Sequence, residues 1–527
     1  MEMMTSTPPL LITSLLLLLL TWLLSRVLKN AGGNHGHRSI PSPPAFPIIG
    51  HLHLLKKPLH LSLAALAKRY GGDAAGVLLL RFGAKPVLLV TSPSIADECF
   101  TVHDVALANR PGLASRRLLT DDCPSISTSN YGELWRHLRR LATVHALSAH
   151  RLAATASARD AGARAMAAKL YRAGEASTVS VKAMAYEFVA NVIMAMVAGE
   201  GMAEDEVVGF KEMTEAGIAA AGAANRLDFL PEVMRMMDFG RMAKRLAEVG
   251  KARQQFGQSL VDDYRRRHAH GGGRGGSDEE GTKTPARTVL GDLLRQQREG
   301  SPEQLDDVVI RTVCLSLLQA GTDTSSSTIE WAMALLLNNP NILKKATAEI
   351  HSIVGTSRLI KESDLAGLPY LRSIITETLR LKPLTPNHVP HEASRDCVIA
   401  GHVIKRGTMV LVDVYSMQRD PNMWEDPEKF MPERFMDGNN KVVDEDGSRF
   451  MMPFGKGRRK CPGEGLALRT VGMALGVMVQ CFEWECVGEE VDLSEGSGLT
   501  MPMAVPLVAL CRPRAEMEPF LKMLEMK

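Results

Sequence analysis

The sequence lacks the features that mark several common classes of protein. Its eight cysteines are scattered, with no Cys-x-x-Cys pair and no histidines grouped with them, so neither a disulfide framework nor a zinc site is indicated. The formal net charge is only +3 over 527 residues, which is too small to favour a nucleic-acid partner. There is no Asn-x-Ser/Thr sequon and no internal repeat. These absences favour one large domain with reduced cysteines, in or facing the cytosol.

A long apolar run, LLITSLLLLLLTWLLSRVL, lies near the beginning of the chain, from Leu10 to Leu28. It approaches the roughly 20 residues that a helix needs to cross a bilayer. A cleaved signal peptide is the alternative, but Arg26, Lys29 and Arg38 follow the apolar core rather than precede it, and no clear small-x-small cleavage site ends it. By the positive-inside rule, the sequence predicts a membrane anchor over residues 1–30 with the rest of the chain in the cytosol.

Two further segments suggest how the rest of the chain is organised. Residues 31–50 contain several prolines, which disfavour helix, so we expect a stiff hinge before a catalytic domain over residues 51–527; a PxxP ligand for an SH3-like module is the alternative. Two β-rich runs around a Gly-Ala-Lys-Pro turn predict a hairpin from Val77 to Thr91.

The stretch Arg265–Arg287 is almost without apolar residues and is predicted to be a mobile surface loop. An RNA-binding segment of the RGG type is the alternative, but a single arginine among the glycines gives it little support.

A long helix is predicted from Ser301 to Pro340. Ser301 and Gln304 have the spacing of a capping box, Pro302 suits a first helical turn, and Pro340 marks the end. At 1.5 Å per residue such a helix spans about 50 Å, so we expect it to run through the centre of the molecule.

The middle of that helix carries the stretch AGTDTSSST, Ala320–Thr328. Asp323 and Thr324 place an acid beside a hydroxyl in an otherwise apolar run. One interpretation is a helix kink in which Ser and Thr side chains bond back to carbonyls. The other, if a reactive centre lies nearby, is a proton relay.

Two other motifs combine charged residues at helical spacing. Glu377 and Arg380 lie three residues apart and can share a helix face, and Arg434 could complete a carboxylate held between two guanidiniums. Trp135 and Arg139 lie four apart, so an indole donor and a guanidinium could bind an anion together. For the motif with Glu377 the alternative is a solvated surface pair. For the motif with Trp135 the alternative is ordinary amphipathic packing.

The stretch PFGKGRRKCPGEG, Pro453–Gly465, has three possible interpretations. A phosphate-binding loop requires Gly-Lys-Ser/Thr, which is absent, and a nuclear-import patch conflicts with a membrane anchor. The third is a thiolate on a tight glycine loop: Cys461 precedes a helical pattern over Glu464–Phe482, and glycines let amides approach its sulfur. A helix N-terminus and Arg459 are expected to lower the thiol pKa, which makes a good soft metal ligand.

The sequence resembles the cytochrome P450 family in several motifs, which occur in the expected order. The C-terminal stretch EGSGLTMPMAVPLVALCRPR, Glu495–Arg514, together with NRPGLASRRL and SNYGELWRHLRRL, is similar to the plant family 81 enzymes, which include isoflavone hydroxylases. The matching residues are Phe454, Gly457, Arg459, Cys461 and Gly463 (haem signature FxxGxRxCxG), Ala320–Ser325 (oxygen-activating helix), Glu377 and Arg380 (ExxR), Arg434 (PERF), and Trp135 with Arg139 (WxxxR).

This resemblance implies a mainly α-helical haem-thiolate fold with small β-sheets, preceded by an N-terminal transmembrane helix, and haem b (iron protoporphyrin IX) as cofactor. Cys461 is the implied axial ligand of the haem iron, whose electron donation promotes O–O cleavage. Asp323 and Thr324 are the implied proton donors to dioxygen. The other implied cofactor-binding residues are Trp135, Arg139, His391 and Arg459 at the propionates, and Phe454, Gly457 and Gly463 in the ligand loop.

The expected partners also follow from the resemblance. Because the chain has no flavin or nicotinamide fingerprint of its own, electrons are expected from NADPH through a separate NADPH-cytochrome P450 reductase. Lys456, Arg458 and Lys460 are candidates for docking it, although a merely solvated loop is the alternative. The other expected partners are O2, a lipophilic substrate and membrane lipid, with no nucleic acid. The expected location is the endoplasmic-reticulum membrane, single-pass, with the catalytic domain facing the cytosol.

The departures from the family 81 pattern concern the substrate. Asn387 and His388 stand where apolar residues are usual, Met503 where a Lys is frequent, and Val412–Pro421 differs from the common form. His388 either contacts the substrate or turns out of the pocket and is satisfied elsewhere. The candidate substrate contacts are Leu317, Ala320, Leu384, Asn387, His388, Thr500 and Met501, with the zone Thr120–Ser127.

The sequence thus predicts a haem-thiolate monooxygenase that hydroxylates a plant aromatic metabolite, such as a flavonoid or indole, or a xenobiotic. Two alternatives are a haem-thiolate isomerase or dehydratase that needs no reductase and a catalytically silent ligand-binding relative. Intact Asp323 and Thr324 argue against the first, and the complete haem signature argues against the second.

Overall fold

The computed structural model describes residues 40–71, 76–120, 123–174, 177–220, 228–229, 240–269, 287–300, 305–437 and 451–525, together with Ser14 and Thr21. The chain divides into two units, Met1–Ile40 and Pro41–Lys527. Apart from Ser14 and Thr21, the predicted anchor over residues 1–30 lies outside the described residues. All that follows concerns the second unit.

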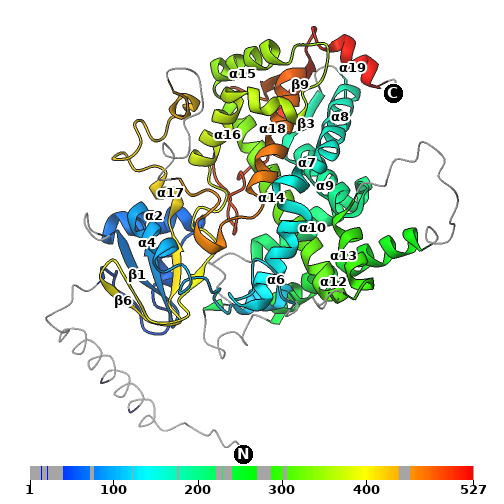
Figure 1. Ribbon diagram of the computed structural model, residues 1–527. Coiled ribbons are helices and arrows are strands. Elements are labelled where there is room, and N and C mark those ends of the chain that lie inside the picture. Colours follow the sequence, from blue (N-terminus) through cyan, green and yellow to red (C-terminus); the bar gives the residue numbers. More distant parts are fainter. Residues whose placement is uncertain are drawn as a thin grey trace, which may run out of the picture. The chain divides into compact units, whose positions relative to one another are not determined.

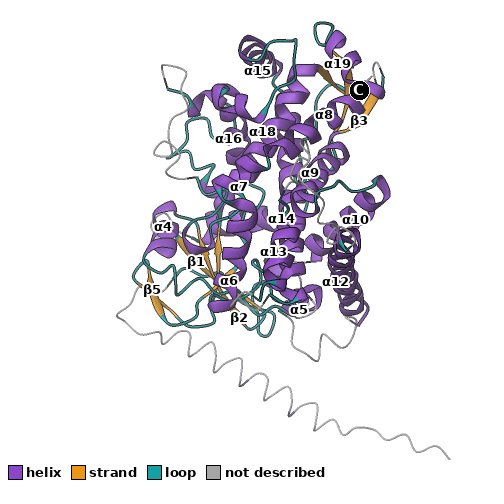
Figure 2. Ribbon diagram, turned by 45° about the vertical axis from the view of Figure 1, so that its right-hand side comes forward, coloured by secondary structure: helices purple, strands orange, loops and turns teal. Residues whose placement is uncertain are grey.

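Helices make up most of the second unit (Figures 1 and 2). The α-helices are α2 (Leu59–Tyr70), α4 (Pro93–Thr101), α5 (Ala114–Thr120), α6 (Glu133–Ala142), α7 (Ala149–Ala154), α8 (Ala156–Arg172), α9 (Val181–Ala198), α10 (Glu204–Ala220), α12 (Gly240–His268), α13 (Val289–Arg298), α14 (Asp307–Leu337), α15 (Pro340–Ile353), α16 (Pro369–Leu381), α17 (Val414–Met417), α18 (Glu464–Cys481) and α19 (Glu518–Glu525). Shorter helical turns are η1 (Leu52–Leu54), η2 (Thr143–Leu147), η4 (Glu362–Gly367), η5 (Pro432–Phe435) and η6 (Gly457–Arg459).

The strands form three small sheets. The predicted hairpin is confirmed as β1 (Val77–Phe82) and β2 (Lys85–Val90), and the sheet continues through β7 (Met409–Val412) to β4 (His391–Glu392) in the order β1-β2-β7-β4. A second sheet contains β3 (Ser177–Ser180), β9 (Val508–Pro513) and β8 (Phe482–Cys486), and β5 (Cys397–Ile399) pairs with β6 (His402–Ile404). Figure 1 shows the strands β1 and β6 grouped with α2 and α4, apart from most of the helices.

The proline-rich segment packs on the first sheet from Pro41 onward. The amide of Leu79 donates to the Pro41 carbonyl (2.8 Å), and the amide of His51 donates to the Arg81 carbonyl (2.7 Å). The later part of the predicted hinge is therefore held against β1 by backbone hydrogen bonds rather than forming a separate spacer.

Helix α14 is the long central helix that the sequence predicts, with a later start. It begins at Asp307, where the Asp306 side chain accepts a hydrogen bond from the amide of Val309 (2.8 Å). The predicted capping residues Ser301 and Gln304 lie outside the described residues. Every residue from 325 to 337 is buried, and α9 packs along the helix, as Figures 1 and 2 show.

Small residues allow this close contact between α9 and α14. A Cβ on Gly321 would lie 2.6 Å from Ile193 Cδ1, which is closer than real Cβ contacts allow. Helix α9 is itself long and apolar enough to span a bilayer, but 78% of it is buried inside the protein. Such burial is typical of a core helix.

The predicted loop Arg265–Arg287 begins four residues too early. Helix α12 continues through Arg265–His268, because Arg265 forms two hydrogen bonds to Asp307 (2.7 and 2.6 Å) and Arg267 pairs with Glu200. Ion pairs with neighbouring elements therefore extend the helix into a segment that contains almost no apolar residues. Residues 270–286 lie outside the described residues.

Candidate active site around Cys461 and the central helix

Cys461 lies in a tight loop immediately before α18. The backbone amide of Cys461 donates to the Phe454 carbonyl (2.8 Å), which closes the loop. The amides of Gly463 and Glu464, at the beginning of α18, hydrogen-bond the sulfur, and a Cβ on Gly463 would lie 3.7 Å from it. The side chain is exposed although its surroundings are densely packed, as for a sulfur at the bottom of a recess.

The prediction of a lowered thiol pKa is wrong for this protein chain. Burial raises the pKa of Cys461 and outweighs the amides of Gly463 and Glu464 and the nearby Arg139, each of which favours the thiolate. The cation that acts on the sulfur is Arg139 rather than Arg459. A bound cation would reverse the balance, because a thiol that coordinates a metal loses its proton.

Gly457 has a different role from the one that the sequence suggested. Its φ is +67°, and a Cβ there would lie 2.7 Å from the Phe100 carbonyl oxygen and 2.6 Å from Asp104 Oδ1. Glycine at this position therefore allows the loop to pack against the end of α4, rather than giving an amide access to the sulfur.

We expect Gly457→Ala to lower the free energy of unfolding by about 1–3 kcal/mol more than Gly355→Ala does. Gly355 has a similar positive φ (+80°), but no described atom lies within 4 Å of the place that a Cβ would take, so it controls for backbone strain alone. Urea unfolding of the two variants measures the difference. Equal losses would contradict the packing explanation.

Arg459 joins the Cys461 loop to the segment before α6. Its guanidinium donates to the carbonyls of Ala108 (2.7 Å), Ile126 (3.2 Å) and Ser129 (2.6 Å). Trp135 lies beside it, with the Arg459 guanidinium carbon 4.5 Å and that of Arg139 5.6 Å from the centre of an indole ring. The indole N–H of Trp135 donates to the Ile126 carbonyl (3.0 Å).

Four arginines and one histidine gather at this point. The pKa of Arg459 is lowered to about 10, first by burial and then by the charges of Arg116 and Arg139. Burial also lowers the pKa of Arg110 well below its ordinary value, and the charges of Arg459 and Arg116 add to this effect. His391 is also buried, with Nδ1 2.8 Å from the Leu107 carbonyl oxygen, and burial and Arg110 lower its pKa.

Two members of this cluster were not predicted from the sequence, the half-buried Arg116 and the buried Arg110. Backbone carbonyls hold the guanidinium of Arg110 in place. One of its nitrogens donates to the carbonyls of Val389 and Pro390 (2.6 and 2.9 Å), while its buried Nε has no hydrogen-bond partner in the described chain. The Asn-Arg-Pro of the stretch NRPGLASRRL was the available signal. Among the described residues, Arg110, Arg139 and Arg459 form no ion pair with a carboxylate, so the cluster can accommodate an anionic group.

The central helix presents an accessible stripe to the same region. Helix α14 packs against α18, which follows Cys461, and against α6, which carries Trp135 and Arg139. Leu317, Ala320 and Thr324, spaced three and four residues apart, are partly or fully exposed in a helix that is otherwise largely buried. This stripe is consistent with an open space beside the helix.

Asp323 and Thr324 do not contact each other through their side chains. The Thr324 hydroxyl donates to the Ala320 carbonyl (2.7 Å), while both carboxylate oxygens of Asp323 have partners outside α14: Lys182 Nζ at 3.2 Å and Thr500 Oγ1 at 3.3 Å. Back-bonding of the kind expected for a helix kink is therefore present, but α14 is continuous through it.

The structure brings Glu377, Arg380 and Arg434 together. Arg380 donates to both oxygens of Glu377 (2.7 and 2.8 Å), and Arg434 Nε lies 3.3 Å from Glu377 Oε1. The side chains of Glu377 and Arg380 are fully buried. Arg380 also donates to the carbonyls of Gln418 and Pro427, so the pair connects α16 to the segment before η5.

Four candidate substrate residues that lie outside α14 are buried, namely Leu384, Asn387, Thr500 and Met501. Leu384 and Met501 come from separate segments that meet through a hydrogen bond from the Met501 amide to the Leu384 carbonyl (2.9 Å). Asn387 is buried, and its side-chain Nδ2 has no partner among the described residues. Residues 121 and 122 of the zone Thr120–Ser127 lie outside the described residues.

For His388 the structure shows a side chain that is satisfied within the protein, while its direction relative to a substrate stays a prediction. The ring is buried, with Nε2 2.8 Å from the Met452 carbonyl oxygen, and it lies near Phe100 and Gly455. Burial lowers its pKa to about 4. The backbone has φ +51°, which turns the side chain toward the Cys461 loop, where the Met452 carbonyl satisfies it.

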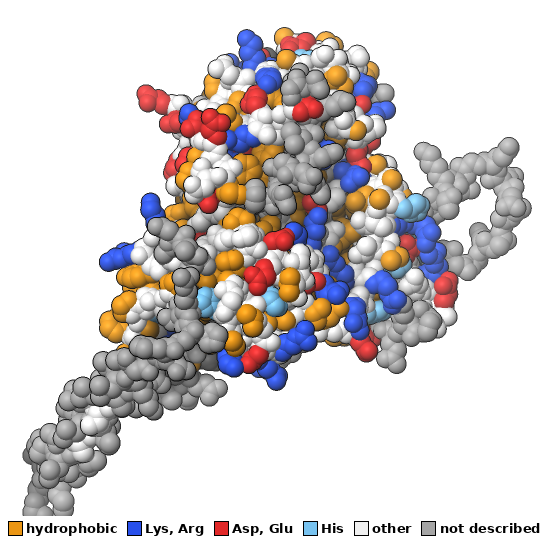
Figure 3. All heavy atoms as spheres, turned by 60° about the vertical axis from the view of Figure 1, so that its left-hand side comes forward, with side chains coloured by type: hydrophobic (Ala, Val, Ile, Leu, Met, Phe, Trp, Pro, Cys, Tyr) orange, Lys and Arg blue, Asp and Glu red, His pale blue; other side chains and the backbone are white. Residues whose placement is uncertain are grey.

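The three basic residues proposed for docking a reductase are each paired with a carboxylate. Lys456 pairs with Asp97, Arg458 with Asp104 (3.2 Å) and Lys460 with Glu464 (2.8 Å). On the face drawn in Figure 3, acidic and basic side chains are intermixed with hydrophobic ones. The loop therefore presents mixed charge rather than a purely basic surface.

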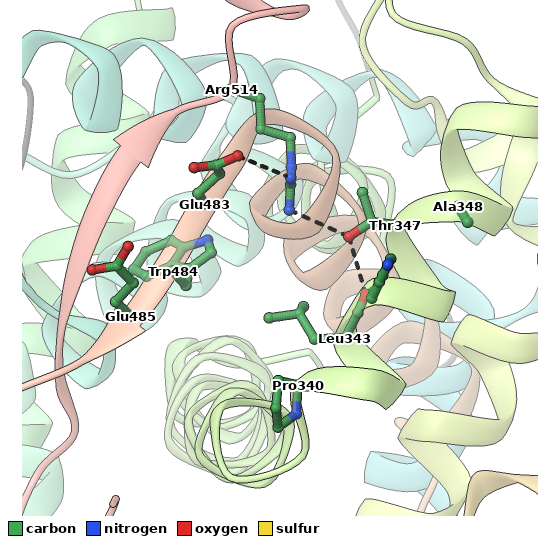
Figure 4. A pocket seen from close by; sticks show the side chains of 9 residues that line it. Pro340, Leu343, Thr347, Ala348, Glu483, Trp484, Glu485 and Arg514 are labelled. Carbon is green, nitrogen blue, oxygen red and sulfur yellow. Dashed lines mark hydrogen bonds and ion pairs between the residues drawn. The ribbon is translucent and has the colours of Figure 1, made fainter. Parts of the chain in front are cut away.

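A separate surface groove of about 430 Å³ lies between α15 and β8 (Figure 4). Arg514 spans it, 3.6 Å from Glu483 and 3.3 Å from the Thr347 hydroxyl. None of the predicted site residues lines this groove. The site at Cys461 is therefore not the same as this groove.

The family profile described as Cytochrome P450 matches residues 40–507 of the chain. The chain belongs to the cytochrome P450 family. It is similar to Cytochrome P450 81Q32 of Catharanthus roseus, with 41% identity covering 93% of this chain and 95% of that one. It is also similar to (+)-piperitol/(+)-sesamin synthase CYP81Q2 of Sesamum radiatum (39%, 92% of each chain) and to Isoflavone 3'-hydroxylase of Medicago truncatula (38%, 90% and 92%).

Membership of the family makes the protein a cytochrome P450 monooxygenase with haem b as cofactor, which uses O2, a lipophilic substrate and a redox partner. The mainly helical fold with small sheets is the P450 fold, as predicted. The side chains fit this cofactor. The accessible sulfur of Cys461 is a suitable iron ligand, and the guanidiniums of the cluster, with the orphaned Nε of Arg110, suit the haem propionates.

Proposed function

We propose that this P450 hydroxylates a lipophilic aromatic plant metabolite, such as an isoflavonoid or indole, or a xenobiotic. The observation that carries the proposal is the combination of an accessible Cys461 with a partly buried cationic cluster and an accessible stripe on α14. Relatives of similar length are named Isoflavone 3'-hydroxylase and (+)-piperitol/(+)-sesamin synthase CYP81Q2, which supports an aromatic substrate class.

In this proposal, the thiolate of Cys461 would bind the haem iron, and the loop amides of Gly463 and Glu464 would stabilise its negative charge. Trp135, Arg139, His391 and Arg459 hold the propionates together with Arg110, while Phe454 and Gly457 shape the loop. When bound, the haem supplies the oxidising chemistry: RH + O2 + NADPH + H⁺ gives ROH + H2O + NADP⁺. The buried pair Glu377 and Arg380, with Arg434, braces the fold.

Asp323 and Thr324 deliver protons in the proposed mechanism. Thr324 lies on the accessible stripe of α14 and presents a hydroxyl there, while Asp323 is the nearest acid on the same helix. The Thr324 hydroxyl has one proton, which the Ala320 carbonyl accepts in the structure, so the hydroxyl would rotate to donate that proton toward the open side while its oxygen accepts another.

Asn387 is the proposed polar contact to the substrate. A buried amide nitrogen without a partner, as Asn387 Nδ2 is among the described residues, costs free energy, so a substrate oxygen that accepts its hydrogen bond would offset that cost. Leu317, Ala320, Leu384, Thr500 and Met501 would supply the remaining contacts, and His388 would support the loop from outside the pocket.

We infer that the redox partner is NADPH-cytochrome P450 reductase and that residues 1–30 anchor the enzyme in the endoplasmic-reticulum membrane, single-pass, with the catalytic domain facing the cytosol. The apolar run Leu10–Leu28 and the basic residues after it support this topology. Lys456, Arg458 and Lys460 remain candidates for docking, with their ion pairs exchanged for acidic groups of the reductase.

The experiment that tests the proposed function is NADPH-dependent turnover with added reductase over a panel of isoflavones, flavones, indoles and herbicides. We expect at least one hydroxylated product by mass spectrometry. Turnover of a lipid hydroperoxide without reductase would favour the isomerase or dehydratase, and binding without any product would favour the silent relative.

Thr324→Ala is expected to divert NADPH from product to hydrogen peroxide. Removing the hydroxyl interrupts the proposed route for protons, while the small side chain leaves the helix intact. The measurement is the ratio of product and of peroxide to NADPH consumed. An unchanged ratio would count against the relay.

A further inference from the structure

Lys182 is a buried charge that the mechanism above does not use. It lies in the first turn of α9, and its side chain is 8% exposed. An ammonium group has three N–H donors, and the structure provides three acceptors: Asp323 Oδ1 at 3.2 Å, Ser326 Oγ at 3.3 Å and the hydroxyl of Ser327. All three belong to α14, so the lysine is satisfied entirely by the helix that carries the proposed relay.

The nearby Glu330 forms no ion pair with this ammonium among the described residues. Burial raises the pKa of Glu330, and the charge of Lys182 opposes that rise only in part. The Oε1 atom of Glu330 accepts a hydrogen bond from the Leu507 amide (2.9 Å). Asp323 is therefore the carboxylate that compensates Lys182 in a buried environment, where such a pair is sensitive to the loss of either partner.

A second contact holds Asp323 from another element. Thr500 donates to Asp323 Oδ2 (3.3 Å), and the adjacent Met501 is fixed by its amide to Leu384 and by its carbonyl, which accepts the indole N–H of Trp331 (2.9 Å). The carboxylate is thus held between α9 and the C-terminal segment that contains the proposed substrate contacts.

We propose that Lys182 is a positioning residue of the proton relay, which holds Asp323 between α9 and Thr500 and so determines how well Asp323 supplies protons. The inference rests on the proposed function, because it presupposes that Asp323 and Thr324 deliver protons. Lys182 acts through Asp323 and does not itself touch the reacting atoms.

The test compares Lys182→Met, Lys182→Arg and Thr500→Val with the surface control Lys169→Met, since Lys169 pairs with Glu187 but is 44% exposed. The probe is an isoflavone with NADPH and added reductase, and the readouts are product and hydrogen peroxide per NADPH. In the unproductive reaction, O2 + NADPH + H⁺ gives H2O2 + NADP⁺.

We expect product per NADPH to fall about tenfold in Lys182→Met, less than the roughly 10²–10⁴-fold that a whole proton-transfer group contributes. Lys182→Arg should restore part of the loss, Thr500→Val should show a smaller loss, and Lys169→Met should resemble the wild type. If Lys182→Met does not fold, the product ratios of Lys182→Arg and Thr500→Val test the inference instead. Wild-type ratios in all folded site variants overturn the inference.

A readout independent of turnover tests the contact itself. In urea unfolding, Lys182→Met, Asp323→Asn and the double variant should show clearly non-additive effects on the unfolding equilibrium. Additive effects would overturn the inference. Absence of any product from the wild type over the whole panel of isoflavones, flavones, indoles and herbicides would instead overturn the proposed function, and the inference with it. Product formation with unchanged ratios overturns the inference alone.

Discussion

Cys461→Ser should abolish the thiolate-type Soret band of the reduced, carbon-monoxide-bound protein, together with NADPH-dependent hydroxylation. The sulfur is the only side chain in its loop that combines accessibility with hydrogen bonds from the amides of Gly463 and Glu464, among the residues that the structure describes. A serine oxygen is a harder and weaker donor to the iron, so the electronic contribution of the thiolate would be lost.

The matched control is Cys486→Ser. Cys486 is half-buried in β8, away from the Cys461 loop, and its replacement should leave the band and the turnover unchanged. Both variants can be compared by difference spectra at equal haem content. Persistence of the thiolate band in Cys461→Ser would contradict the ligand assignment.

Glu377→Gln should lower the free energy of unfolding by about 3–5 kcal/mol, a loss large enough to prevent accumulation of folded protein in many domains. Arg380 is fully buried and donates to both oxygens of Glu377, and Arg434 approaches the same carboxylate. Glutamine has the same shape but no charge, so it leaves a buried guanidinium without its counter-charge.

Glu428→Gln provides the surface comparison for this prediction. Glu428 also faces an arginine, Arg419, at 3.3 Å, but its side chain is 74% exposed, so its replacement should cost no more than about 1 kcal/mol. Urea unfolding of the two variants measures the difference. Similar costs would show that the Glu377 pair contributes no more than a surface ion pair.

Local signals in the sequence were sufficient for the hairpin, for the helix after Cys461 and for the tight loop that ends where this helix begins, at Glu464. The helical pattern after Cys461 predicted α18 to within one residue, and the turn between two β-rich runs predicted the hairpin of β1 and β2. These predictions succeed because capping, turns and periodicity depend on neighbours in sequence.

Contacts between distant segments were not predictable in the same way. Lys182 lies 141 residues before Asp323, and no periodicity of α9 distinguishes it from a surface lysine. Arg110 reaches carbonyls about 280 residues away, and the direction of His388 depends on a positive φ that its residue type does not suggest. Side-chain partners of this kind are determined by tertiary packing.

The thiol of Cys461 shows how competing effects decide an outcome. The sequence correctly indicated amides near the sulfur, but the cation that favours the thiolate is Arg139 rather than the predicted Arg459, and the sequence could not reveal how closely protein surrounds the sulfur. Burial proved to be the largest effect, and it raises the pKa. The balance between these effects requires the packed structure.

The most direct test of the central claim is the origin of the oxygen atom in the product. The protein with its reductase is supplied with NADPH, the aromatic substrate found in the panel and ¹⁸O2 in unlabelled water, and the product is weighed by mass spectrometry. A cytochrome P450 monooxygenase incorporates one labelled oxygen atom per product molecule. A product whose new oxygen is unlabelled, or one that forms equally well without NADPH, would contradict it.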